Sequence, residues 1–143
     1  KGYQALPADT DIVLVHDGVR PFLSKDMIQE AINIAAEFGA AITAIPVNDT
    51  IKQVDNSGKV ERTVDRESLW RVQTPQAFRY DLLGEAFRKA QKHSFYGTDE
   101  GALIENLGQE VRIVNGSEWN LKITRPEDLV LGESIVAKLF PEA

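Results

Sequence analysis

One short segment combines residue types that bind phosphate and divalent cations. Residues 16–21 (HDGVRP) directly follow Ile12-Val13-Leu14-Val15, four consecutive residues that favour β-strands. Ligands of open α/β sheets gather beyond the carboxyl ends of strands, where Asp17 would lie. A carboxylate there can hold Mg²⁺, which shares oxygen ligands with phosphates, and Arg20 can grip the same ligand with two N–H donors. A structural alternative stays open, in which Asp17 caps a turn and Arg20 pairs with it.

Other candidates lie later in the chain, each with its own structural alternative. Arg66 lies near Trp70, where an arginine either stacks on the indole or binds a ligand. Thr98 opens a predicted helix, where an ordinary cap is a more frequent role than an anion site. Lys122 alternates with apolar neighbours, which is typical of a solvated charge unless the side chain points inward.

The composition excludes several kinds of site. The sequence has no cysteine, which removes disulfides, thiolate metal ligands and a cysteine nucleophile. It has two histidines, too few for a zinc site built on several imidazoles. We expect His16 to be a hydrogen-bonded structural residue and His93 to be solvated. Neither G-x-G-x-x-G nor G-x-x-x-x-G-K-[ST] occurs in the sequence, so both common glycine-rich phosphate loops are absent from it.

Charge and hydropathy indicate a soluble globular protein. There are 16 Lys+Arg against 22 Asp+Glu, a formal charge of −6, which disfavours a nucleic-acid surface. No apolar run approaches the roughly 20 residues of a membrane helix, and residues 1–10 lack a signal-peptide pattern. We therefore expect a cytoplasmic protein that binds neither nucleic acid nor membrane.

The elements that would position these residues begin with a strand–helix–strand unit. The run 12–17 predicts a strand that is buried on both faces. Ser24 as N-cap and apolar residues at helical spacing predict a helix that continues to Phe38 and ends at Gly39. Residues 41–47 predict a second buried strand, which completes a right-handed βαβ unit.

The pattern then changes to the alternation of a β-hairpin. Residues 51–54 and 59–64 alternate apolar and polar side chains around Asp55-Asn56-Ser57-Gly58. A hairpin with such weak apolar faces is unstable alone, so we expect it to pack elsewhere, a second subunit being one candidate. The remaining predicted elements are helices at 80–92, from 98 to 107 and from 126 onward, a third parallel-type strand at 110–114 and an extended piece at 120–124.

These predictions add up to a single α/β domain over residues 1–143. Three parallel buried strands make a thin sheet, whose first strand would be an apolar edge. The sequence also opens on Lys1 without an initiator methionine. We therefore expect the chain to be the N-terminally truncated part of a longer domain.

Six ordered sequence blocks match one known family in order and spacing. They are 13–22 (VLVHDGVRPF), 46–52 (PVNDTIK), 63–70 (TVDRESLW), 73–78 (QTPQAF), 97–100 (GTDE) and 120–129 (NLKITRPEDL). Through them nearly the whole chain resembles the 2-C-methyl-D-erythritol 4-phosphate cytidylyltransferases of the non-mevalonate isoprenoid pathway. The resemblance implies a Rossmann-like (GT-A-like) nucleotidyltransferase fold, a mostly parallel sheet flanked by helices with a β-hairpin arm at about 48–66. The implied reaction transfers CMP from CTP to methylerythritol phosphate with Mg²⁺ and releases diphosphate.

The resemblance also implies roles for individual residues of the sheet edge. Asp17 resembles the family's aspartate at the Mg²⁺ and sugar-phosphate site, and Arg20 and the backbone of Gly18 resemble substrate contacts. Lys122 resembles the lysine that stabilises charge on the α-phosphate. Thr74 resembles a hydroxyl contact to the substrate.

The hairpin is implied to act across a homodimer. In the family it is an arm exchanged between subunits, so Thr50 and Arg66 would contact substrate in the partner's active site, with Arg66 gripping its phosphate. Thr98 resembles a second hydroxyl contact to the same substrate.

Two other functions stay open on the sequence. Ribitol or ribulose 5-phosphate cytidylyltransferases share the H-D-x-x-R-P-F and Q-T-P-Q blocks, although 63–70 looks more like the methylerythritol phosphate branch. A non-catalytic dimerisation module is the third interpretation. The family's N-terminal half, with its glycine-rich CTP loop and its arginine and lysine on the triphosphate, does not occur in this chain, so we expect the chain alone to be close to inactive.

Overall fold

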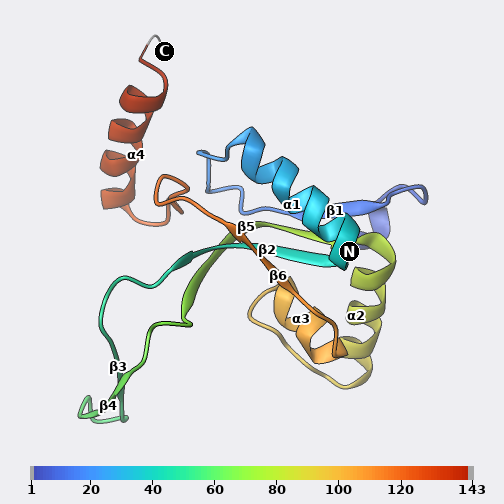
Figure 1. Ribbon diagram of the computed structural model, residues 1–143, viewed down its shortest axis with the longest axis horizontal. Coiled ribbons are helices and arrows are strands. Elements are labelled where there is room, and N and C mark those ends of the chain that lie inside the picture. The colour runs from blue at the N-terminus through green and yellow to red at the C-terminus, as the bar shows by residue number, and fades with distance from the viewer. Residues whose placement is uncertain (1, 142–143) are drawn as a thin grey trace.

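A four-stranded mixed sheet forms the centre of the protein (Figure 1). The computed structural model describes residues 2–141. The strands of the sheet, in spatial order, are β1 (Ile12–Val15), β5 (Trp70–Arg79), β2 (Ala40–Pro46) and β6 (Arg112–Asn115). β2 and β6 are parallel, whereas β5 is antiparallel to both of its neighbours, so β1, β2 and β6 all run in the same direction.

The α/β class and the edge position of the first strand are confirmed, but the prediction of a three-stranded parallel sheet is wrong. The sequence analysis missed β5, which lies between the two strands of the predicted βαβ unit. Its sequence, WRVQTPQAFR, contains Pro75 and two glutamines and lacks the apolar run of a buried strand. The strand pairs with β1 through its second half and with β2 through both halves, and Gln76 faces Val15 on one side and Ile42 on the other.

Helix α1 (Lys25–Phe38) covers one face of the sheet. Ser24 caps it as predicted, since its hydroxyl oxygen accepts a hydrogen bond from the Met27 amide at 3.2 Å. Gly39 ends the helix with a positive φ of 96°, which favours glycine. The buried side chains of this face are small, which lets the helix approach the strands closely: Met27, Ala31, Ala35, Ala41, Ala77 and Val114.

Helices α2 (Tyr80–Lys92) and α3 (Glu100–Leu107) cover the opposite face. Successive strand residues point to opposite faces, so Phe78 joins this second core while Ala77 joins the first. α3 begins two residues later than the predicted Thr98, because the Asp99 carboxylate accepts the Ala102 amide at 2.8 Å and acts as its N-cap. A short 3-10 turn, η1 (Tyr3–Ala5), stacks Tyr3 on Tyr80 at 4.6 Å.

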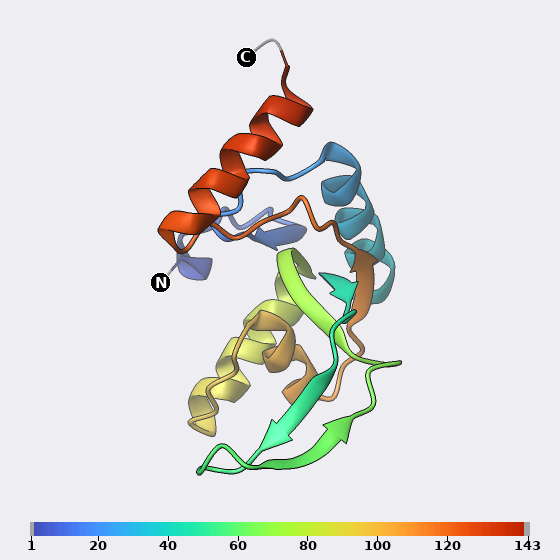
Figure 2. The same cartoon turned by 90° about the vertical axis from the view of Figure 1, so that its left-hand side faces the viewer.

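The predicted hairpin forms a separate two-stranded sheet, β3 (Ile51–Val54) and β4 (Val60–Val64). Figures 1 and 2 show this arm reaching away from the body. Its turn is built on Asp55, whose carboxylate accepts the amides of Ser57 and Lys59, with Gly58 at a φ of 83°. Val54 and Val60 near the tip are 52% and 53% exposed, so the apolar residues of the arm lack a partner within the described chain.

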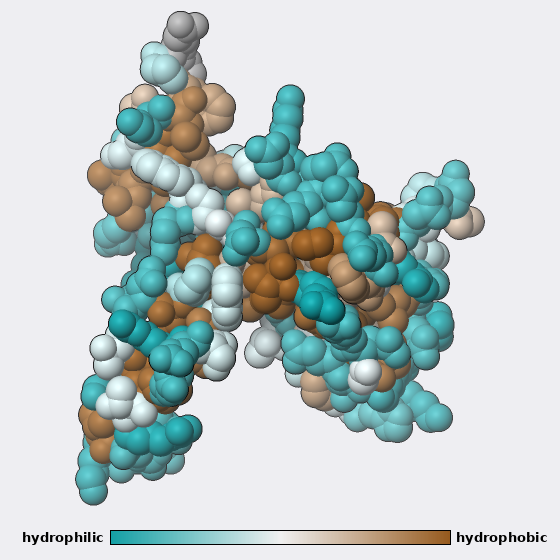
Figure 3. All heavy atoms as spheres, in the orientation of Figure 1, coloured by the Kyte–Doolittle hydropathy of each residue, from teal (hydrophilic) through white to brown (hydrophobic). Residues whose placement is uncertain are grey.

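Helix α4 (Pro126–Leu139) also projects from the body (Figure 1). It buries Gly132 and Ile135, while Leu129, Val130 and Leu131 are more than half exposed. Figure 3 shows hydrophobic surface gathered over this helix. Within residues 2–141, no helix is both long and apolar enough to cross a membrane.

Candidate active site

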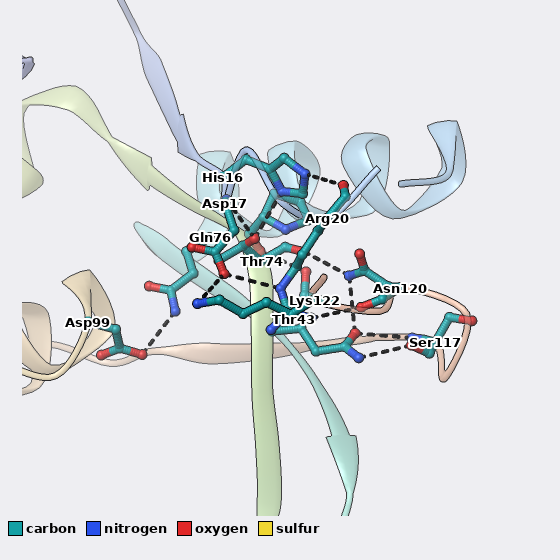
Figure 4. Close-up of polar contacts among 12 residues, drawn as sticks. His16, Asp17, Arg20, Thr43, Thr74, Gln76, Asp99, Ser117, Asn120 and Lys122 are labelled. Carbon is teal, nitrogen blue, oxygen red and sulfur yellow. Dashed lines mark hydrogen bonds and ion pairs between the residues drawn. The ribbon is translucent and has the colours of Figure 1, made fainter. Parts of the chain in front are cut away.

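Three charged side chains from two distant segments meet beyond the carboxyl end of β1 (Figure 4). The Asp17 Oδ2 atom lies 3.2 Å from Arg20 Nε and 3.1 Å from Lys122 Nζ. Asp17 follows β1 directly, and Arg20 lies across a tight turn in which its amide donates to the Asp17 carbonyl at 3.0 Å. Lys122 comes from the loop between β6 and α4. Two cations against one carboxylate leave the cluster with one excess positive charge, which suits an anionic ligand.

The exposure of the two cations differs. The side chain of Arg20 is 11% exposed and that of Lys122 is 46% exposed, with Asp17 between them at 32%. Partial burial on its own would raise the pKa of the Asp17 carboxyl, but hydrogen bonds and positive charge from Lys122 and Arg20 hold that pKa below its usual range. Asp17 therefore stays ionised and keeps both cations oriented.

A ring of hydrogen bonds fixes the turn that carries Asp17. The Asp17 amide donates to the Thr74 hydroxyl oxygen at 3.0 Å, and the same hydroxyl lies 3.0 Å from His16 Nδ1. His16 Nε2 lies 3.0 Å from the Arg20 carbonyl oxygen. Because a carbonyl only accepts, Nε2 carries the hydrogen and Nδ1 accepts from Thr74 in a neutral imidazole. The expectation of a hydrogen-bonded structural His16 is thus confirmed.

Buried amides tie the Lys122 loop to β5. The Asn120 side chain is fully buried and donates to the Thr74 carbonyl at 2.8 Å and to Gln73 Oε1 at 3.2 Å. Gln73 in turn donates to the Ser117 carbonyl at 2.9 Å and accepts its amide at 3.3 Å. A second buried glutamine, Gln76, donates to the Asp99 carboxylate at 2.9 Å and so links β5 to the start of α3.

Among residues 2–141, the carboxylate of this cluster that could bind a metal ion is that of Asp17. Within residues 2–141, no group of three or more His, Cys, Asp or Glu side chains is arranged to hold a metal ion. Asp17 can supply a single oxygen ligand. This donor set fits Mg²⁺, which commonly takes one or two carboxylates together with substrate phosphates and water.

Comparisons with known proteins agree with this geometry. The family model described as IspD, 2-C-methyl-D-erythritol 4-phosphate cytidylyltransferase, matches residues 1–138. The chain belongs to this family. A curated relative from Pelotomaculum thermopropionicum is 50% identical over 135 residues, which cover 94% of this chain and 57% of the relative. One from Geobacillus kaustophilus is 48% identical and covers 99% of this chain and 61% of the relative. Both are named 2-C-methyl-D-erythritol 4-phosphate cytidylyltransferase.

Solved structures of IspD cytidylyltransferases share the fold. The enzyme from Anaerococcus prevotii superposes with a TM-score of 0.86 at 35% identity, covering 94% of this chain and 60% of its own. That from Thermus thermophilus gives 0.85 at 36% identity, covering 94% and 65%. The chain therefore spans about three fifths of the length of the curated relatives that it matches.

The structure brings together only part of the site predicted from the IspD resemblance. Asp17, Arg20, Thr74 and Lys122 are connected directly, with Gly18 in the turn between Asp17 and Arg20. Three other predicted residues have no described contact to this cluster: Thr50, Arg66 and Thr98. Thr50 and Arg66 flank the arm, where Arg66 donates to the Asn48 carbonyl, and Thr98 is exposed ahead of α3.

The buried amides that support the Asp17 cluster were not predicted from the sequence. Gln73, Gln76 and Asn120 lie inside the matching blocks 73–78 and 120–129, but no role was predicted for them. Their partners are far away in sequence, 47 residues separating Asn120 from Gln73. The available signal was a polar residue next to an apolar stretch, which does not distinguish a buried amide from a surface one.

Proposed function

We propose that this chain forms part of an enzyme that transfers CMP from CTP to 2-C-methyl-D-erythritol 4-phosphate and releases diphosphate. The observation that carries the proposal is the convergence of Arg20 and Lys122 on one carboxylate at the carboxyl end of β1. The names of the curated relatives support methylerythritol phosphate as the acceptor and do not favour a ribitol or ribulose 5-phosphate enzyme or a non-catalytic module.

The chemistry requires no side-chain nucleophile. A phosphate oxygen of methylerythritol phosphate forms a bond to the α-phosphorus of CTP, while the bond from that phosphorus to the diphosphate breaks. The attacking oxygen is already anionic, so catalysis rests on positioning and charge neutralisation. This agrees with a site in which His16 is committed to holding a turn and no thiol exists.

The residues of the cluster take different parts in positioning the substrates and neutralising their charge. An ammonium group has three donors, so the bond from Lys122 to Asp17 leaves others for the oxygens of the α-phosphate, where charge accumulates. Arg20, nearly buried and held by Asp17, presents a fixed guanidinium to the acceptor beside the Gly18 backbone. Thr74 shares its hydroxyl between His16 and the Asp17 amide and contacts the same substrate. Thr98 supplies a second hydroxyl.

We further propose that Asp17 supplies a ligand to Mg²⁺. The ion would neutralise triphosphate charge and orient the leaving diphosphate. The lowered pKa of Asp17 supports this role, because a carboxylate must be ionised to bind the metal.

The arm supports a homodimer in which each active site is shared. Val54 and Val60 are half exposed on a hairpin too small to be stable alone, and in this proposal they pack on a second subunit. Arg66 would then grip the acceptor phosphate in the partner's site with Thr50 beside it. The cysteine-free sequence suits a cytoplasmic location, which needs no disulfides.

Diphosphate release tests the function directly. The protein that carries this chain is incubated with CTP, Mg²⁺ and either methylerythritol phosphate or ribitol 5-phosphate. We expect diphosphate and the cytidine diphosphate adduct with methylerythritol phosphate only. Turnover of ribitol 5-phosphate at an equal rate, or of neither acceptor, would contradict the proposal.

A further inference from the structure

We propose that Asn120 is a positioning residue that sets the geometry of both cations in the active site. This inference rests on the proposed function and concerns a residue that contacts neither substrate. The backbone carbonyl of Asn120 orients Arg20, and the Asn120 side chain anchors the loop that carries Lys122.

The Asn120 amide has one defined orientation. Gln73 is fixed by Ser117. Its Nε2 donates to the Ser117 carbonyl, and its Oε1 accepts from the Ser117 amide. Asn120 Nδ2 therefore faces two acceptors, Gln73 Oε1 and the Thr74 carbonyl. A flipped amide would turn its oxygen toward both of these acceptors, so the orientation is determined by the surrounding chain.

The side-chain oxygen of Asn120 is energetically unfavourable where it lies. Asn120 Oδ1 is a buried side-chain oxygen without a hydrogen-bond partner in the described part of the chain. Burying an acceptor without a donor is unfavourable; an apolar residue of the same shape would avoid that cost but would leave the Thr74 carbonyl without the Asn120 donor. Packing alone therefore does not explain an asparagine here, whereas anchoring of the loop by Nδ2 does.

The backbone of Asn120 orients Arg20. The Asn120 carbonyl oxygen accepts from Arg20 Nη1 at 2.7 Å, while Arg20 Nε donates to Asp17 at 3.2 Å. The guanidinium is planar and rigid, so these two bonds fix its plane. Figure 4 shows Arg20 held between Asp17 and the Asn120 loop. A shift of the Asn120 backbone would turn the guanidinium away from its position beside Asp17.

The same anchor places Lys122, which is two residues further along the loop. Beyond Lys122 the loop is held again, where the Ile123 amide donates to the Val19 carbonyl at 2.8 Å. Lys122 thus lies between two attachment points, the Asn120 side chain on β5 and Ile123 on the Asp17–Arg20 turn. Loss of the first removes the side-chain anchor nearest to Lys122 on that side, so that the loop is held there only by the Ser117–Gln73 bonds and the bond from Arg20 to the Asn120 carbonyl.

The test compares Asn120→Leu, which keeps the branched shape of the side chain and removes the anchor, with Ile104→Val as a control. Ile104 is a fully buried residue of the other core, remote from the cations, and its truncation lowers stability alone. Two measurements are made on each variant: kcat for CMP transfer, and the hydrogen-exchange protection of the Arg20 Nε–H signal in ¹⁵N NMR spectra. The second measurement does not depend on activity.

For Asn120→Leu we expect loss of Arg20 Nε–H protection and a fall in kcat of at least about tenfold, since small misplacements of catalytic groups have large effects on rate. For Ile104→Val we expect both readouts within about twofold of wild type.

A protected Arg20 signal in Asn120→Leu, or a kcat matching that of Ile104→Val, would overturn the inference. If Asn120→Leu does not fold, Gln73→Met removes the Gln73 acceptor of the anchor together with the two Ser117 bonds, leaves the bond to the Thr74 carbonyl, and is judged by the same readouts in the same direction. A wild type without transferase activity refutes the proposed function, and the Arg20 signal then decides the inference by itself.

Discussion

Asp17 holds two cations of different exposure with one carboxylate oxygen. Arg20 is nearly buried and bonded on two sides, whereas Lys122 is about half exposed and bonded at its tip. A fixed guanidinium suits recognition of a bound phosphate, and a more accessible ammonium suits a charge that develops during reaction. On this difference we propose Arg20 for substrate binding and Lys122 for stabilisation of the transition state.

Replacement of Lys122 should therefore affect kcat more than substrate binding. For Lys122→Met we expect kcat to fall by about 10²–10³, equivalent to about 3–4 kcal/mol of transition-state stabilisation, the effect typical of one lost preorganised charge. KM for methylerythritol phosphate should change much less. Steady-state diphosphate release measures both constants, with Lys92→Met in the last turn of α2 as the matched surface variant. Equal effects on kcat and KM would argue against this assignment.

The ion pairs of Asp17 should also make stability depend on pH. Its pKa in the folded protein is lower than in the unfolded chain, where it is about 3.9. The stabilisation is thus complete above that value and is lost as the pH falls through the folded pKa. We expect Asp17→Asn to lower the free energy of unfolding near neutral pH. As the pH falls from about 5 to about 2, the free energies of unfolding of wild type and variant should approach each other. Urea titrations across this range measure it; two parallel stability profiles would contradict the prediction.

At the level of the elements, the site depends on how the β6–α4 loop packs against β5. The loop leaves β6 through Gly116, whose amide donates to the Ala44 carbonyl at 2.8 Å. A Cβ at this position would lie 2.5 Å from Gln73 Oε1 and 3.1 Å from the Ala44 carbonyl oxygen. Because Gln73 is buried and bonded to both Ser117 and Asn120, it has little freedom to move away.

We accordingly expect Gly116→Ala to impair both stability and catalysis. Overpacking of this kind lowers the free energy of unfolding by about 1–3 kcal/mol, and displacement of the loop moves Lys122. Gly2→Ala serves as control, since a Cβ there meets nothing within 4 Å. Urea denaturation and diphosphate release together test the prediction. A Gly116→Ala enzyme with the stability and kcat of wild type would show that the loop accommodates the methyl group.

Elements with a local signal were predictable from the sequence, and those defined by distant partners were not. The Ser24 cap and Gly39 predicted α1, and the alternation around Gly58 predicted the arm, because each depends on neighbours in sequence. β5 was missed because its pairing comes from β1 and β2 rather than from its own apolar pattern. Asp17 and Arg20 lie three residues apart, so this part of the site was predictable, whereas the buried amides that support it bond across the fold.

At the scale of the whole molecule, the residues proposed for one reaction are divided between the body and the arm. Figure 1 shows the arm reaching away from the four-stranded sheet. Arg66 bonds to Asn48 at the base of the arm and makes no described contact to that cluster. A single subunit therefore presents Asp17 and Arg66 at separate places.

This separation has a consequence for mixtures of defective subunits. If the protein forms the proposed homodimer, the Asp17→Asn and Arg66→Ala variants should each be close to inactive alone. When they are unfolded and refolded together, each mixed dimer places the intact body of one chain against the intact arm of the other. One of its two sites is then wild type, so that about a quarter of all sites in an equal mixture regain activity. Refolding each variant separately before mixing is the control. If the co-refolded mixture stays inactive while wild type refolds, Arg66 acts within its own chain. Coexpression of the two variant genes would then restore no activity.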